Sequence, residues 1–475
     1  MNAWIHQANA AVEVVLVWYF FILNGGYILL SVLAFREVHR HLLRSIYGGY
    51  EHTARSPLTP AISILVPAHN EQVSIALTVN NLLHLDYMRY EVVVINDGST
   101  DGTLEELKTV FQLEPSLERG DRRLSSAPVH AVYASRRHHN LIVIDKENGG
   151  KSDALNAGLN HARHPYFCSI DADVILEADA LQRVVQAIVE TDKRVVGVGG
   201  IVRVANGCRV EKGRIIEVAM SRTALVVFQV VEYFRAFLCG RTGFSGFNGL
   251  MIISGAFGVF ERELVIDVGG YRTGTVGEDM DLVTRLHARM RENGTSDYLI
   301  KFLPDPVCWT EVPDTLRVLI RQRRRWQKGL LQVLCAHSRM FLNPRYGAVG
   351  LIAYPFFFIF EGWGIVIELI GYAFFFIMWL RGSLNGDFAV AFLCVALLCG
   401  WALSLSGIIL GEMTPKRYPK FRDLLIMVAF ALTENLGYRQ MTSLMRLVGI
   451  TDYLRGTGDW GFMERKGLLR KQNQG

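Results

Sequence analysis

Two carboxylates separated by a single residue follow a short apolar run in the middle of the chain. The run is residues 166–170, and the acids are Asp171 and Asp173. Alternate positions of an extended backbone face the same way, so both carboxylates can point to one side. A divalent cation would neutralise their repulsion, and hard oxygen ligands suit Mg²⁺ or Mn²⁺. The pair also fits a turn whose acids cap the next helix, so other residues must decide between these interpretations.

Three further groups have residue types suited to chemistry on a phosphorylated sugar. Asp279, in the acidic run after Gly277, could act as a general base, although an acidic helix N-terminus explains the same run. Arg325 could pair with a diphosphate and Trp326 could stack on a sugar ring, although a basic helix near anionic lipid has a similar composition. Lys151 follows two glycines, where it could meet phosphate or simply be solvated.

An α/β alternation predicts where these side chains lie. Apolar strands are expected after Ala61 and at residues 91–95, 141–144 and 166–170, with helices at residues 74–85 and from about Ser152. This order predicts a parallel sheet with crossover helices, whose strand ends gather acids on one edge. Residues 111–139 are charged and are interpreted as a surface excursion. Residues 251–262 are expected to form two strands with a bend between them, and helices are expected at 224–238, from about Glu278, and at 316–334.

Long apolar runs on both sides of this region predict membrane helices. Residues 12–35 are long enough to span a bilayer, and residues 354–380 and 388–410 read as a hairpin. Arg36, Arg40 and Arg44 follow the first run, which places that end in the cytosol and the N-terminus outside. The predicted units are an N-terminal transmembrane helix at 1–46, a linker at 47–60, a cytosolic domain at 61–345, a transmembrane hairpin at 346–412, and an interfacial or re-entrant helix with a basic cytosolic tail at 413–475.

Composition excludes several other classes. The chain has 475 residues, half of them hydrophobic, and a formal charge of only +5, so a nucleic-acid-binding protein is not expected. Seven scattered cysteines without Cys-x-x-Cys spacing argue against a zinc site or a disulfide framework. Neither a GxxxxGK[ST] nor a GxGxxG motif follows the first strand, which argues against an NTPase or a dinucleotide enzyme. Transfer from a nucleotide sugar remains the strong candidate.

Several motifs in order resemble the membrane-bound family 2 glycosyltransferases, which include hyaluronan, chitin, cellulose and poly-N-acetylglucosamine synthases. The resemblance covers roughly residues 61–329 and the flanking membrane helices. The similar segments are PAHNE at 67–71, INDGSTDGT at 95–103, GGKSDALN at 149–156, IDADV at 170–174, SGAF at 254–257, GED at 277–279, and QRRRW at 322–326, which matches QxxRW. The resemblance implies a GT-A (nucleotide-diphospho-sugar transferase) domain with a Rossmann-like mixed α/β sheet, in the cytosol and flanked by transmembrane helices.

The resemblance also implies a role for each matching residue. Asp279 is expected to be the general base. The residues expected to bind the nucleotide sugar are Glu71, Asp97, Lys151, Asp153, Asp171 and Arg325; those expected at the acceptor are Glu278, Gln322 and Trp326; and the expected metal ligands are Asp171 and Asp173.

The sequence therefore predicts inverting, metal-dependent transfer of a hexose or N-acetylhexosamine from a UDP-sugar to an acceptor hydroxyl. We expect an enzyme of the cell (plasma or inner) membrane that builds a β-linked exopolysaccharide, with a homo-oligomer or an export partner as an open option because few helices are predicted. Two alternatives stay open: a single transfer to a membrane lipid, favoured by the small number of helices, and a non-catalytic transporter or nucleotide-sensing scaffold, which a missing base or metal acid would have favoured.

Overall fold

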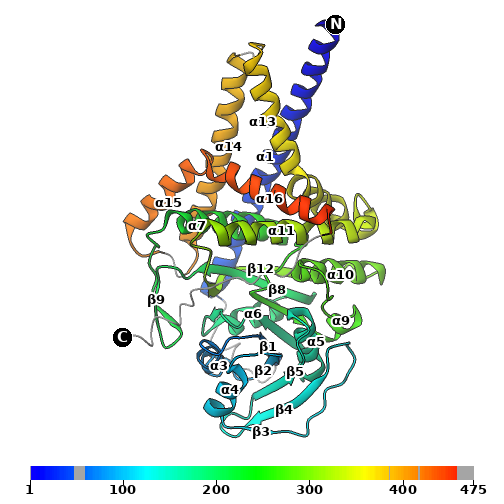
Figure 1. The fold of residues 1–475 in the computed structure, drawn as a ribbon, viewed down its shortest axis with the longest axis vertical. Helices are drawn as coiled ribbons and strands as arrows, with labels where there is room; N and C mark the ends of the chain where they lie inside the picture. The colour runs from blue at the N-terminus through cyan, green and yellow to red at the C-terminus, as the bar shows by residue number, and fades with distance from the viewer. Residues whose placement is uncertain (1, 48–58, 384–385, 416–417, 457–475) are drawn as a thin grey trace.

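A computed structural model describes residues 2–47, 59–383, 386–415 and 418–456. The expected linker at 47–60 and the basic residues of the tail after Arg455 lie almost entirely outside these ranges. A sheet domain forms one end of the molecule, and long helices project from the other (Figure 1).

The sheet has ten strands in the order β3-β4-β5-β2-β1-β6-β11-β8-β12-β7. Four neighbouring strands are parallel, as predicted. They are β5 (Leu141–Lys146), β2 (Tyr90–Asp97), β1 (Ile62–Ala68) and β6 (Tyr166–Ile170). Beyond β6 the sheet is mixed, because β11 (Phe257–Glu261) runs antiparallel to β6 and to β8 (Arg194–Val204), while β12 (Tyr298–Thr310) is parallel to β8. The short β7 (Ile175–Leu176) closes this edge.

Six helices in the described part of the chain connect these strands, and three of them lie where the sequence predicted helices, with shifted ends. The connecting helices are α3 (Ile75–Leu82), α4 (Thr103–Phe111), α5 (Lys151–His161), α6 (Ala180–Val189), α9 (Arg262–Asp267) and α10 (Glu278–Glu292). The three predicted ones are α3, α5 and α10. A separate hairpin consists of β9 (Arg209–Glu211) and β10 (Arg214–Glu217). The parallel strands are mainly apolar, as expected for strands buried on both faces of a sheet.

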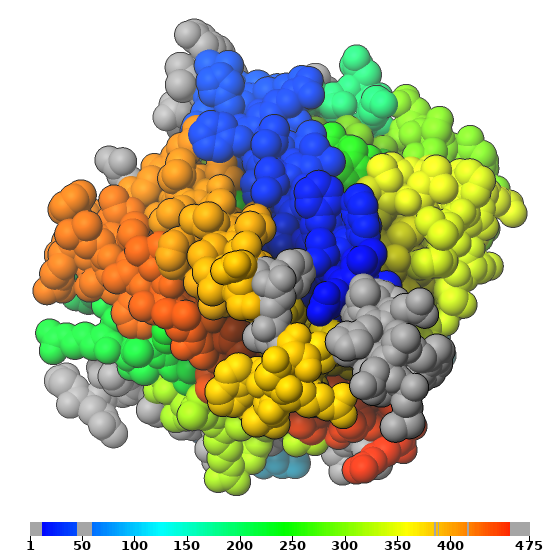
Figure 2. Space-filling model, turned by 90° about the horizontal axis from the view of Figure 1, so that it is seen from above, coloured from blue at the N-terminus to red at the C-terminus, as the bar shows by residue number. Residues whose placement is uncertain are grey.

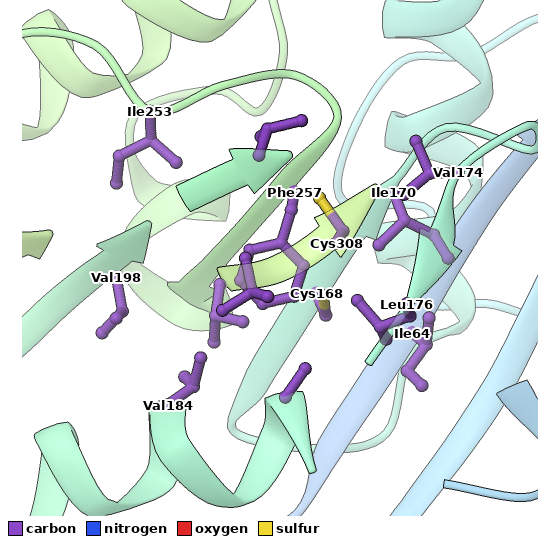
Figure 3. Close-up of a cluster of buried hydrophobic side chains, with 14 of the residues drawn as sticks. Ile64, Cys168, Ile170, Val174, Leu176, Val184, Val198, Ile253, Phe257 and Cys308 are labelled. Carbon is purple, nitrogen blue, oxygen red and sulfur yellow. The ribbon is translucent and has the colours of Figure 1, made fainter. Parts of the chain in front are cut away.

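Two sequence interpretations within the domain were wrong. The excursion at 111–139 contains β3 (Leu113–Pro115) and β4 (Val129–Ser135), and β4 pairs antiparallel with β5 at the sheet edge. The first strand expected in 251–262 is absent, and only β11 forms there. Ile253 instead packs in the core, over sheet positions where Gly199 and Gly258 leave room for its side chain (Figure 3). Ile253 is therefore apolar because it packs against the sheet, and it does not belong to a strand of the sheet.

A layer of helices lies across the domain beneath the upright helices (Figure 1). This layer includes α7 (Ala224–Phe234), the π-helical turn η1 (Arg235–Arg241), α8 (Thr242–Ser245), α11 (Leu316–Ala336), α15 (Phe421–Thr433) and α16 (Tyr438–Leu454). The short turns η2 (Ser338–Met340), η3 (Pro344–Tyr346), η4 (Val349–Ala353), α12 (Tyr354–Phe356) and η5 (Phe357–Gly362) lead from α11 to the upright helices.

The upright helices are α1 (Asn2–Tyr47), α13 (Gly364–Leu380) and α14 (Gly386–Met413). Among the described residues, two segments are long and apolar enough to span a membrane, 12–44 and 389–413. A third, bent by 44°, joins 349–362 to 364–380, so the apolar run expected to be one helix is broken at Trp363. From the end opposite the sheet, α1 lies between the orange α14 and the yellow segment that precedes α13 (Figure 2).

Candidate active site

A cavity of about 1230 Å³ begins at the edge of the sheet and continues between the upright helices. Its domain end is lined by nine of the residues that the sequence singled out: Glu71, Lys151, Asp171, Asp173, Glu278, Asp279, Gln322, Arg325 and Trp326. Its other end is lined by residues of the apolar segments, among them Tyr19, Tyr27, Phe360, Glu361, Glu368, Tyr372 and Phe392. The fold thus joins the strand-end carboxylates and the membrane-type helices in one continuous space.

Asp171 and Asp173 enter this cavity from the loop that follows β6. Nζ of Lys151, at the start of α5, lies 2.5 Å from Oδ1 of Asp171 and 3.7 Å from Oε1 of Glu278. Burial disfavours the charged lysine, but the carboxylates of Asp171 and Glu278 outweigh it and raise the pKa of Lys151. Burial raises the pKa of Glu278, against the lowering influence of Lys151. The cavity therefore holds an ammonium group amid clustered carboxylates.

Asp279 lies in the first turn of α10, where the helix dipole favours a carboxylate. Its Oδ2 accepts a hydrogen bond of 3.1 Å from the backbone N–H of Gly255, and its Oδ1 accepts one of 2.8 Å from Met280. Gly277, just before the helix, touches Gly329 of α11, and a Cβ on Gly277 would lie 3.0 Å from the Gly329 carbonyl oxygen. This close approach of two glycines sets Asp279 beside α11.

Helix α11 presents Gln322, Arg325 and Trp326 to the cavity, at the i, i+3 and i+4 spacing of one helix face. The intervening arginines have partners in the protein. Arg323 forms a bidentate pair of 2.8 Å contacts with Glu232 of α7, and its guanidinium lies 4.6 Å from the centre of the Trp326 ring. Arg323 therefore anchors α11 to α7 while it also lines the cavity.

Asp97 and Asp153 are brought together, but neither lines the cavity. Both contact Nζ of the fully buried Lys146, at 2.5 and 2.7 Å. Asp97 also accepts hydrogen bonds from the backbone N–H groups of Gly149 and Gly150, at 3.0 and 2.8 Å. These carboxylates thus shape the glycine loop that leads into Lys151.

Sequence reasoning missed two cationic residues in or near this site. Lys146 ends an apolar strand just before the NGG loop, and a lysine so placed in a buried run is a signal of an internal ion pair. Arg241 of η1 lines the cavity, and nothing in its local sequence marks it. Polar residues of the upright segments were also undervalued: Tyr27 donates a hydrogen bond to Glu361, which pairs with Arg446 at 3.1 Å.

The carboxylates fit a cation that is also held by a ligand. Among the described residues, no group of three or more His, Cys, Asp or Glu side chains could hold a metal ion. Asp171 and Asp173 supply two hard oxygen donors on the cavity wall, so further ligand positions would fall to substrate oxygens. These two carboxylates would hold Mg²⁺ or Mn²⁺, and the cation would supply positive charge to a bound diphosphate.

Comparison with known proteins identifies the domain. Residues 63–269 match the family described as Glycosyl transferase family 2. The chain is 30% identical over 274 residues to a poly-beta-1,6-N-acetyl-D-glucosamine synthase of Staphylococcus aureus strain COL, an alignment covering 58% of this chain and 55% of that protein. The counterpart in Staphylococcus epidermidis is 29% identical over the same length. The chain thus spans about half the length of the curated relatives it matches.

The fold also matches a solved glycosyltransferase. The mannosyltransferase PcManGT from Pyrobaculum calidifontis, solved in complex with GDP-Man and Mn2+, aligns with 92% of this chain and 100% of its own, with a TM-score of 0.51 and 19% identity. This similarity concerns the fold alone. By sequence, residues 63–269 match the model of Glycosyl transferase family 2, and the chain is similar to poly-beta-1,6-N-acetyl-D-glucosamine synthases over 274 residues.

Proposed function

We propose that the chain transfers an N-acetylhexosamine from a UDP-sugar to a saccharide hydroxyl, with inversion, and so extends a β-linked polysaccharide at a membrane. One observation carries this proposal above others. A single cavity is lined by the strand-end carboxylates, by Asp279, by the sugar-stacking face of α11, and by the upright apolar segments. The relatives' name, poly-beta-1,6-N-acetyl-D-glucosamine synthase, supports N-acetylglucosamine as the donor sugar. A hexose is the alternative donor.

The proposed chemistry assigns each cavity residue a task. Asp279 accepts the proton of the acceptor hydroxyl as that oxygen attacks the anomeric carbon from the face opposite UDP. The N–H groups of Gly255 and Met280 hold its carboxylate in one orientation for this step. Lys151 and Arg325 add positive charge beside the departing diphosphate. Glu71 contributes to the nucleotide pocket, and Gln322, Trp326 and Glu278 border the acceptor.

Asp171 and Asp173 would hold Mg²⁺ or Mn²⁺ together with the diphosphate, and the cation would supply charge stabilisation for the leaving group. Asp97 and Asp153 act in this scheme through Lys146. They fix the loop of Gly149 and Gly150, which sets the position of Lys151 against Asp171.

The far end of the cavity favours a polymer over a single small product. Hydrogen-bonding side chains continue beyond the domain end, where Arg446 of α16 reaches both Glu361 of η5, at 3.1 Å, and Gln327 of α11, at 2.9 Å. Burying such polar groups among apolar segments costs free energy. They can form hydrogen bonds with the hydroxyl groups of a saccharide chain that passes them. A membrane lipid acceptor is the second candidate, because Phe356, Phe360 and Phe392 line the same space.

The membrane arrangement in this proposal is multi-pass, with a cytosolic domain and the N-terminus outside. Arg36, Arg40 and Arg44 at the domain end of α1 support that orientation by the positive-inside rule. The proposal has three versions, which differ in what exports the product: this chain alone, a homo-oligomer, or this chain with a partner protein.

The test is incubation of the full chain in lipid nanodiscs with a panel of radiolabelled UDP-sugars and Mg²⁺ or Mn²⁺. We expect UDP-N-acetylglucosamine to be consumed and a high-molecular-weight, β-hexosaminidase-sensitive product to form. A labelled product that partitions into organic solvent would favour the lipid acceptor. No UDP release from any donor, with and without a saccharide primer, would overturn the proposal.

A further inference from the structure

Arg241 is a buried guanidinium in the cavity that lacks a full set of protein partners. It ends the π-helical turn η1, and it lines the same space as Asp279 and Trp326. Its Nη1 is buried and has no hydrogen-bond partner among the described residues. An unsatisfied donor on a charged group costs about 1–3 kcal/mol or more. A guanidinium in this state beside a cavity can donate a hydrogen bond to an oxygen atom of a ligand.

Three other arginines around the cavity have a carboxylate partner, although Nε of Arg323 also lacks a hydrogen-bond partner among the described residues. Arg235, in the same turn, pairs with Glu434, Arg323 pairs with Glu232, and Arg446 pairs with Glu361. The acid that most favours the charged form of Arg241 is Asp279, whose two oxygens already accept backbone hydrogen bonds. Burial nevertheless lowers the pKa of Arg241 to about 10, so it remains protonated at neutral pH.

The surroundings of Arg241 place it on the acceptor side of the proposed base. Its guanidinium lies 4.2 Å from the centre of the Phe237 ring, which covers one face and leaves the N–H edge as the donor. Two residues on, Gly243 packs so closely on α1 that a Cβ there would lie 2.5 Å from the carbonyl oxygen of Leu30. Arg241 therefore lies between Asp279 and the upright helices, away from the nucleotide loops.

We propose that Arg241 binds the acceptor saccharide by donating hydrogen bonds to the amide carbonyl oxygen of an N-acetylated sugar. This inference rests on the proposed function and adds a specificity determinant to it. A guanidinium donates a charge-assisted hydrogen bond to an amide oxygen. It repels the ammonium group that replaces the amide when the same sugar lacks its acetyl group. Arg241 thus selects N-acetylated over de-N-acetylated acceptors.

The test compares two acceptors on the full chain in nanodiscs, with a labelled UDP-N-acetylhexosamine as donor. One primer is an N-acetylated oligosaccharide and the other is its de-N-acetylated counterpart. For the wild type we expect the kcat/KM ratio of the two primers to favour the acetylated one. In Arg241→Gln we expect this ratio to fall about 10- to 100-fold. The KM for the donor should stay within about twofold.

Arg203→Gln is the matched control. Arg203 of β8 is also a buried arginine over a ring, 4.6 Å from the centre of Phe234, and its Nε and Nη1 also lack partners. It lies outside the cavity lining and donates a hydrogen bond to Thr414. Its substitution should affect stability without changing the primer ratio. If Arg241→Gln folds poorly, Arg241→Lys provides a second test. It keeps the charge and should retain part of the preference for the acetylated primer.

The outcomes separate this inference from the function on which it rests. A wild type that turns over no UDP-N-acetylhexosamine overturns both. An active wild type whose primer ratio is unchanged in Arg241→Gln and Arg241→Lys overturns the role of Arg241 alone. An equal change in Arg203→Gln, or a matching loss of primer-independent UDP release, would assign Arg241 to general stability and also overturn it.

Discussion

The proposed nucleotide side and the proposed acceptor side of the site differ in how their charged groups are paired. On the nucleotide side, Asp97 and Asp153 are compensated by the buried Lys146 and by backbone N–H groups. On the acceptor side, Nη1 of Arg241 and Oε1 of Gln322 are buried without partners among the described residues. The carboxylates of the first region are paired within the protein, whereas our proposals assign ligand partners to the second. Substitutions should therefore cost stability in the first region and activity in the second.

The largest expected effect is on the acceptor side, at Asp279. Asp279→Asn should lower transfer about 10²- to 10⁴-fold, because the amide cannot take the acceptor proton. UDP-sugar affinity, measured by isothermal titration, should change little. Asp281→Asn is the control, since Asp281 points away to Arg285 and His337 and its loss should reduce stability instead. Near-normal turnover in Asp279→Asn would remove it as the base.

The next effect is on the nucleotide side, at Lys146. Lys146→Met leaves two carboxylates without their buried partner, which should lower the free energy of unfolding by about 3–5 kcal/mol. Chemical denaturation in detergent micelles measures this change. Lys108→Met breaks an exposed pair with Glu105 and should cost less than about 1 kcal/mol. Equal losses in the two variants would contradict a preassembled nucleotide side.

The scaffold of the acceptor side should be sensitive to acid through His287 of α10. Burial lowers the pKa of His287 from 6.5 to about 4, against the raising effect of its hydrogen bond to the Leu250 carbonyl. The unfolded chain takes up the proton near pH 6.5 and the folded chain only near pH 4, so stability is lost as pH falls across that window. The slope is about 1.4 kcal/mol per pH unit for this one group. Denaturation at several pH values should show a shallower slope in His287→Gln, and an unchanged slope would assign the acid sensitivity elsewhere.

The smallest effect is expected at Trp326. Trp326→Leu should raise the KM for a saccharide primer about tenfold through the loss of ring stacking, while donor binding stays unchanged. Trp326→Phe keeps an aromatic face and should recover part of the loss. A larger effect on the donor KM than on the primer KM would show that Trp326 acts in donor binding and would contradict its role at the acceptor.

Local patterns determined the parts of the fold whose partners are near in sequence. The strand–helix alternation around β1, β2, β5 and β6 predicted a parallel sheet, and the acids at its strand ends predicted the location of the cavity. The ordered motifs predicted the family. The pairing of β4 was missed because β4 lies next to the edge strand β3 and follows a charged segment. The first strand expected in 251–262 was wrong because Ile253 packs on the sheet instead.

By itself the sequence determined which side chains could do chemistry and in what order they follow one another. Only the tertiary structure decided which charges are already paired. Asp97 and Lys146 are 49 positions apart, and Arg446 and Glu361 are 85 apart. The spacing of residues carries no record of such pairs, because folding brings them together through packing of whole elements. Nucleotide binding by Asp97 and Asp153 stays a prediction, to which the structure adds their pairing with Lys146. Arg241 went unnoticed because nothing in its local sequence marks it.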